Sequence, residues 1–218
     1  MKSPQKGIPW SIHNDAGLAL QSARDSFCTI HAELANAYGR KISDRAWKVY
    51  RDLDELRSEL DRLACEENRS RAAEAITLYY RRRRADYDVP EFAVSFRTRP
   101  APRRGWKHRR FTLERHEALA RELRAIHATM FALTNLLARA YPGKLAALAF
   151  KVEDEINTLQ GVLSDTVRAE NPNLNLPVRP GLYFRMASSH EPPALAAALL
   201  RFAQGLNQHH PGAPEASV

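Results

Sequence analysis

The sequence has few cysteines, no long apolar run and no compact glycine-rich motif, and each absence excludes a class of protein. Two cysteines in 218 residues, Cys28 and Cys65, exclude a disulfide scaffold and a four-cysteine zinc site. The longest stretch without a charged residue, 125–138, has fourteen residues and is too short to span a bilayer. The first nine residues lack the apolar core of a signal peptide, so we expect a cytoplasmic protein that does not associate with a membrane.

Motifs for catalysis and cofactor binding are also missing. The nine glycines are scattered and build no phosphate-binding loop, and no nucleophile elbow or His-Glu-x-x-His zinc motif is present. His13 and His116 have no Asp, Glu or His at ligand spacing around them, so we interpret both as residues that make polar contacts at helix ends. We expect no enzyme, no metal and no cofactor, and we interpret both cysteines as small, buried or half-buried side chains.

Apolar residues recur at alternating intervals of three and four, which predicts antiparallel helical hairpins. The first seam runs from Leu20 to Ala37 and the second from Ala46 to Leu63, with Gly39 between them and Ser43 as the expected N-cap. Two more seams, 123–140 and 149–163, flank the turn at Pro142-Gly143. We predict an all-α protein whose two hairpins pack as a four-helix bundle, with deeply buried side chains at Phe27, Leu34, Leu56, Met130, Leu137 and Leu159.

The second hairpin repeats the first at a distance of 103 residues. Without gaps, residues 37–68 and 140–171 share ten identities in 32 positions, which include Tyr38/Tyr141, Glu67/Glu170 and Asn68/Asn171. One step out of register, the run that starts at Leu78 matches the run that starts at Leu182. Leucine-rich and alanine-rich heptads resemble one another in general, but the matched turn residues favour a tandem duplication. His13 and His116 also occupy equivalent positions.

These patterns divide the chain into five parts. They are an N-terminal hairpin (1–80), a basic connecting segment (81–111), a second hairpin (112–171), a proline-rich connection with a C-terminal helix that begins after Pro192-Pro193 (172–208), and a disordered tail (209–218). Within the connecting segment, the alternation at 92–96 predicts a short strand, which can pair with 106–111 as a β-ribbon.

The whole net charge of +8 lies in residues 81–110. This stretch holds eleven basic and three acidic residues, whereas the rest of the chain holds 22 of each sign. Aromatic residues lie among the arginines, and guanidinium groups bind phosphates while aromatic rings stack on bases. We therefore predict a nucleic-acid contact made by Arg81, Arg82, Arg83, Arg84, Arg97, Arg99, Arg103, Arg104, Trp106, Lys107, Arg109 and Arg110.

The favoured hypothesis is a non-catalytic nucleic-acid-binding helical protein, or a small helical subunit of a nucleoprotein complex, with DNA and RNA both open. The alternatives for the segment are a site for an acidic protein partner, as in an assembly or adaptor protein, and a solvated linker. A third hypothesis comes from Arg24 and His31, whose spacing is similar to the Arg-x4–6-His pattern of HEPN-type ribonucleases, which cleave RNA without metal. Surface residues beside the helical seam explain that pair as well.

Overall fold

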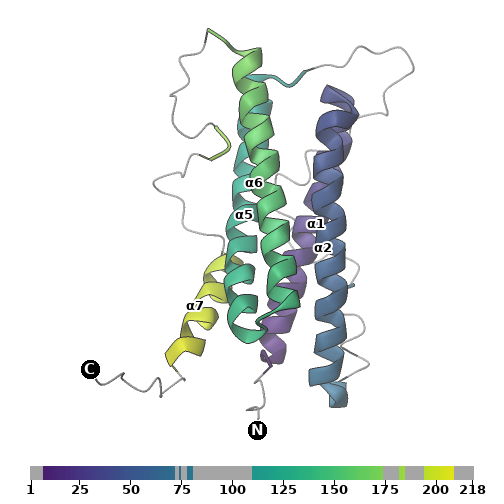
Figure 1. Ribbon diagram of the computed structural model, residues 1–218, viewed down its shortest axis with the longest axis vertical. Coiled ribbons are helices and arrows are strands. Elements are labelled where there is room, and N and C mark those ends of the chain that lie inside the picture. Colours follow the sequence, from purple (N-terminus) through teal and green to yellow (C-terminus); the bar gives the residue numbers. More distant parts are fainter. Residues whose placement is uncertain are drawn as a thin grey trace.

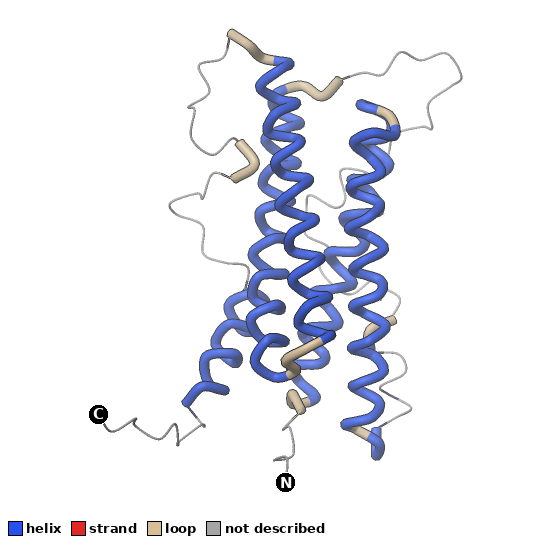
Figure 2. Tube along the Cα trace, viewed as in Figure 1, coloured by secondary structure: helices blue, strands red, loops and turns tan. Residues whose placement is uncertain are grey.

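The computed structural model describes residues 7–71, 74, 78–80, 110–173, 182–184 and 194–208, and among these residues it contains helices and turns but no strand (Figures 1 and 2). The helices are α1 (Trp10–Tyr38), α2 (Arg40–Glu67), the short 3₁₀ helix η1 (Arg69–Arg71), α5 (Leu113–Ala140), α6 (Lys144–Glu170) and α7 (Ala194–Gln208). The predicted all-α fold is confirmed: α1 pairs with α2, α5 pairs with α6, and a C-terminal helix follows.

Both hairpins turn at a glycine with positive φ. Gly39, between α1 and α2, has φ 70°, and Gly143, between α5 and α6, has φ 115°. A side chain is disfavoured at such angles, so the turns depend on glycine. The prediction of Ser43 as an N-cap was wrong, because α2 begins directly after Gly39 and Ser43 lies buried within its first turn.

The core runs the length of the four long helices and continues onto α7. All six side chains predicted as deeply buried have 0% exposure: Phe27, Leu34, Leu56, Met130, Leu137 and Leu159. Each seam is one stripe of an amphipathic helix, and burying it against the facing hairpin supplies the main stabilisation of the bundle. Ala196 and Leu199 of α7 extend the same core.

The two repeats differ on the face that α7 covers. α7 packs mainly against α5, where Ala132 and Leu136 are fully buried although they lie off the seam. The equivalent residues of α1 are Thr29 and Glu33, which are only partly buried and polar. The docking face for this extra helix is therefore formed mainly by the second hairpin, with a smaller contact to α1.

The hairpins face each other around a pseudo-twofold arrangement. Across the α2–α6 contact, Lys48 pairs with Glu155, and Lys151 Nζ lies 2.9 Å from Asp52 Oδ1. Lys48 and Lys151 are equivalent in the repeat, as are Asp52 and Glu155. One contact is thus present twice with the partners exchanged, which is the pattern of a twofold interface.

The structure also bears on the predictions made for the two cysteines and for the β-ribbon. Cys28 is exposed, so its interpretation as a buried or half-buried residue was wrong, whereas Cys65 is half-buried; both are free. The predicted β-ribbon lies outside the described residues except at Arg110 and Phe111, which are not in a strand. No helix in the described part of the chain combines the length and apolarity needed to cross a membrane.

Candidate functional site

A buried polar cluster lies at each end of the bundle, and the two clusters are copies of each other. The first cluster contains His13, Glu67, Tyr79 and Tyr141; the second contains His116, Glu170, Tyr183 and Tyr38. The histidines and the tyrosines at 79 and 183 have 0% exposure. Each cluster joins the start of one helix, the end of the next and the following turn, so it ties together segments far apart in the sequence.

The geometry of the two clusters agrees closely. His13 Nδ1 lies 2.9 Å from the Tyr79 hydroxyl, and His116 Nδ1 lies 2.8 Å from that of Tyr183. The Nε2 atoms lie 3.0 Å from Glu67 Oε2 and 3.1 Å from Glu170 Oε2 respectively. Both histidine–tyrosine ring pairs have centroids 6.1 Å apart and are nearly perpendicular. This agreement supports the tandem duplication.

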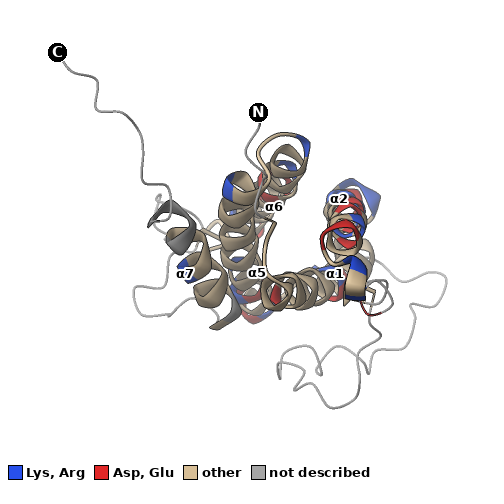
Figure 3. Cartoon of the chain, turned by 90° about the horizontal axis from the view of Figure 1, so that it is seen from below, with Lys and Arg blue, Asp and Glu red and all other residues tan. Residues whose placement is uncertain are grey.

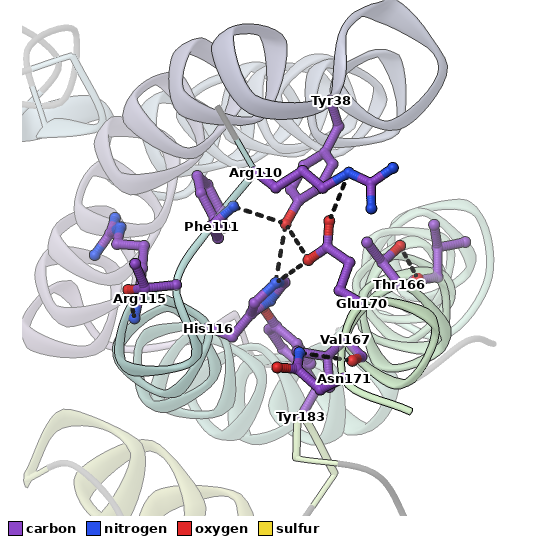
Figure 4. A network of polar contacts seen from close by, with 12 residues as sticks. Tyr38, Arg110, Phe111, Arg115, His116, Thr166, Val167, Glu170, Asn171 and Tyr183 are labelled. Atoms are coloured by element: carbon purple, nitrogen blue, oxygen red, sulfur yellow. Dashed lines mark hydrogen bonds and ion pairs between the residues drawn. The ribbon is translucent and has the colours of Figure 1, made fainter. Parts of the chain in front are cut away.

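Each cluster takes one tyrosine from the opposite hairpin. Tyr38, at the end of α1, donates to Glu170 of α6 at 3.1 Å (Figure 4). Tyr141, after α5, donates to Glu67 of α2 at 2.7 Å. The same hydroxyls accept backbone N–H groups, from Phe111 at 3.2 Å and from Ile8 at 3.1 Å. The exchange links the two hairpins at both ends of the bundle.

Hydrogen bonding assigns the protons in each cluster. An ionised carboxylate can only accept, so the Nε2 of a neutral imidazole carries the proton and donates to the glutamate. Nδ1 then accepts from the hydroxyl of Tyr79 or Tyr183. Burial lowers the pKa of His13 and His116, against the opposing effect of their glutamate partners. Burial also raises the pKa of the four tyrosines, which keeps their hydroxyls protonated as donors.

These clusters have the properties of structural contacts that hold helices together. Both ring nitrogens of each histidine are engaged and the rings are inaccessible to solvent, so neither imidazole is free to bind a ligand. Within the described part of the chain, no group of three or more His, Cys, Asp and Glu side chains is arranged to hold a metal ion.

The basic segment returns to the bundle at the second cluster. Arg110 Nε lies 3.6 Å from Glu170 Oε1, and the next residue, Phe111, donates its N–H to Tyr38 (Figure 4). Phe111 also packs edge-on against Tyr38 and His116. The last predicted contact residue is thereby held beside a buried network, although its own side chain stays largely exposed.

The segment leaves the first hairpin at the other end of α1. There Tyr79 is bonded to His13, and Tyr80 contacts Ser58 through its hydroxyl at 2.7 Å, with the Arg57 guanidinium over its ring. His13 and Tyr38 are separated by about 37 Å along α1 at 1.5 Å per residue. The two flanks of the segment are therefore fixed at opposite ends of the bundle.

Of the twelve predicted contact residues, Arg110 is the one that the structure describes. The other eleven, Arg81, Arg82, Arg83, Arg84, Arg97, Arg99, Arg103, Arg104, Trp106, Lys107 and Arg109, lie outside the described residues. The HEPN-like pair is described: Arg24 Nε lies 3.0 Å from Asp54 Oδ1, and the His31 ring lies 5.2 Å from that of Trp47. Both side chains therefore contact α2.

Sequence reasoning found the members of the clusters but not the clusters. The two histidines, the two glutamates and the exchanged tyrosines were all noted as repeat matches, and Tyr79 and Tyr183 lie in the shifted match at 78 and 182. The signal that unites them is their equivalence in the repeat, since each member of one cluster has its counterpart in the other.

Comparisons of the chain with family models, with curated proteins and with solved structures found no match. Its functional inference therefore depends on its own residues.

Proposed function

We propose that this chain is a non-catalytic, nucleic-acid-binding helical protein, or a small helical subunit of a nucleoprotein complex, in which the bundle is the scaffold and residues 81–110 contact phosphates. One observation carries the proposal: the segment holds the entire net charge of +8, and the rest of the chain is balanced. Eleven cations within thirty residues repel one another unless a polyanion neutralises them.

The anchoring of the segment supports this proposal. Its flanks are held about 37 Å apart along α1, which equals the length of about eleven base pairs at 3.4 Å each. A basic connection held at both ends loses less entropy on binding than a free tail, because its ends are already fixed. The cytoplasmic location expected from the sequence is part of the proposal.

The decisive experiment compares two variants of equal charge change with wild type. R103A/R104A/R109A removes three cations of the segment and leaves Arg110 in its pair with Glu170. R121A/R168A/R201A removes three exposed arginines of the second hairpin and α7 as the matched control. Binding to a labelled duplex and to a labelled single strand is measured by fluorescence anisotropy at several salt concentrations.

We expect the segment variant to bind more weakly and to show a shallower salt dependence, by up to about 0.9 per lost phosphate contact on duplex DNA and about 0.7 on a single strand. The control should bind as wild type does. Equal affinity of the segment variant and wild type at every salt concentration would refute nucleic-acid binding through this segment. A protein that docks acidic partners would then be the leading alternative.

A further inference from the structure

The first half of α2 carries a basic face that the bundle does not use. Residues 40–51 contain five basic residues and one acidic residue, whereas residues 52–67 of the same helix contain two basic and seven acidic ones. Arg40, Lys41, Arg45 and Arg51 are all exposed. None of them forms an ion pair with a carboxylate of the described residues. In the end-on view of Figure 3, blue segments of α2 lie on the outer side of the bundle.

The internal repeat separates scaffold charges from additional charges. Lys48 and Lys151 are present in both copies, and both pair with a carboxylate on the facing hairpin. In contrast, Arg40, Arg45 and Arg51 correspond to Gly143, Leu148 and Asp154, so the equivalent stretch of α6 has two residues of each sign. The second hairpin folds into the same form without these arginines, which shows that the fold does not require them.

An exposed aromatic group lies on the same side of α2 as Arg40 and Arg51, which are seven and four residues from Trp47. Trp47 keeps 42% of its surface exposed although its ring stacks on Tyr50, with centroids 4.8 Å apart and planes at 9°. The Arg24 guanidinium lies over the Tyr50 ring, 4.6 Å from its centre. Arginines that flank an exposed aromatic ring are the elements with which proteins bind single-stranded nucleic acid, because they neutralise phosphates and pack against unpaired bases.

We propose that the side of α2 with Arg40, Trp47 and Arg51, bordered further around the helix by Lys41 and Arg45, is a second contact for nucleic acid, and that it binds a single-stranded stretch. The inference rests on the proposed function and extends it to the bundle itself. From Arg40 to Arg51 the helix is about 16 Å long, which corresponds to about five nucleotides at 3.4 Å each.

The position of the face supports its joint use with the basic segment. α2 begins two residues after Tyr38, and the Tyr38 hydroxyl accepts the N–H of Phe111, where the basic segment returns to the bundle. Arg110 lies at the same end. A strand bound by the segment can therefore continue onto the exposed face of α2, at the end of the bundle that holds the second cluster.

The test uses R40A/R45A/R51A in the full chain, with R121A/R168A/R201A as the control of equal charge change. Binding to a fluorescein-labelled oligothymidylate of twenty nucleotides or so is measured by anisotropy across salt concentrations. We expect the α2-face variant to bind about threefold or more weakly, with the salt slope reduced by up to about 2 for three lost contacts. The unfolding midpoint should not change, since the substituted side chains are exposed.

The outcomes separate this inference from the proposed function. Wild-type affinity of R40A/R45A/R51A, together with a loss in R103A/R104A/R109A, overturns the α2 contact and leaves the proposed function intact. Wild-type affinity of both variants overturns both. A loss in the control equal to that of the α2-face variant also overturns the inference, because it shows that net charge alone decides binding.

Trp47 provides a second measurement. The chain has three tryptophans, so W10F/W106F leaves Trp47 as the single tryptophan reporter. We expect its fluorescence to be quenched when the oligothymidylate binds. Unchanged fluorescence at saturating oligonucleotide would overturn the assignment of Trp47 to the contact.

Discussion

The hydroxyl of Tyr38 lies 3.1 Å from Glu170 Oε2, so the last residue of the first helix is bonded to the last residue of the fourth long helix. Tyr141 has the same relationship to Glu67 at the other end of the bundle. Because each tyrosine satisfies a carboxylate and a backbone N–H of the opposite hairpin, the pair acts as a clasp between the two repeats.

Removal of either exchanged hydroxyl should destabilise the protein. In Tyr38→Phe, the N–H of Phe111 and one oxygen of Glu170 lose a partner, which typically costs about 1–3 kcal/mol for buried groups. Tyr141→Phe should cost a similar amount for the same reason. Tyr80→Phe is the control, because its bond to Ser58 is exposed. Urea denaturation gives the free energies of unfolding, and equal values for the three variants would contradict the clasp.

The buried histidines should make the protein less stable in mild acid. The pKa of His13 in the folded state is lowered from 6.5 by burial, so the unfolded state binds more protons between the two pKa values. This contribution is fully present above about pH 6.5 and is lost as the pH falls toward the folded-state pKa. The pKa of His116 is lowered in the same way. Stability should therefore fall between about pH 7.5 and about pH 5.5.

A variant that cannot titrate isolates this effect. Glu122 acts in the opposite direction, because burial raises its pKa and its stabilising contribution is lost as the pH rises. We therefore expect His13→Gln to lose less stability than wild type between the two pH values, as measured by urea denaturation. A pH dependence identical to that of wild type would show that His13 does not titrate on unfolding.

The ion pairs between α2 and α6 should stabilise the folded protein more strongly where their charged groups are more buried. Lys151→Ala leaves the carboxylate of Asp52, whose side chain is 6% exposed, without its cation, and this should cost about 1–3 kcal/mol. Lys144→Ala removes an exposed pair with Glu59 and should cost about 0–1 kcal/mol. A double-mutant cycle with D52A and K151A measures the coupling directly. A coupling energy near zero would mean that this pair does not hold the helices together.

Two glycines should respond in opposite ways to alanine. A Cβ at Gly7 would lie 2.3 Å from Glu67 Cδ, so the carboxylate would have to move away from His13 and Tyr141. We expect Gly7→Ala to destabilise by about 1–3 kcal/mol, because the buried imidazole of His13 would lose its carboxylate partner. Gly161, inside α6, has nothing within 4 Å of the added Cβ, so Gly161→Ala should stabilise by about 0.5–1 kcal/mol. Thermal unfolding of the two variants checks both signs.

Most of the fold could be predicted from the sequence because each helix keeps its apolar seam. The alternation of three and four fixed the buried faces, and Phe27 and Leu159 are buried as the seam requires. Ser43 misled the prediction of the second helix start, because glycine alone satisfies the turn geometry there.

The clusters were harder to predict because their contacts cross between hairpins. A repeat match shows that Tyr38 and Tyr141 are equivalent, but it does not show which glutamate each one reaches. That depends on the antiparallel approach of the hairpins, which is a property of packing and not of local sequence. The basic face of α2 was readable from charge alone, yet its exposure and its lack of partners depend on the neighbouring helices.

The exchange of Tyr38 and Tyr141 also has a consequence for how such a chain can be connected. Each hairpin completes its cluster with a residue of the other, which is the relationship of two subunits in a symmetric dimer. A chain with one copy of this hairpin would build the same two clusters only by pairing with a second copy. The contacts between the repeats therefore do not require that both belong to one chain. The two halves expressed as separate chains should reassemble into one bundle.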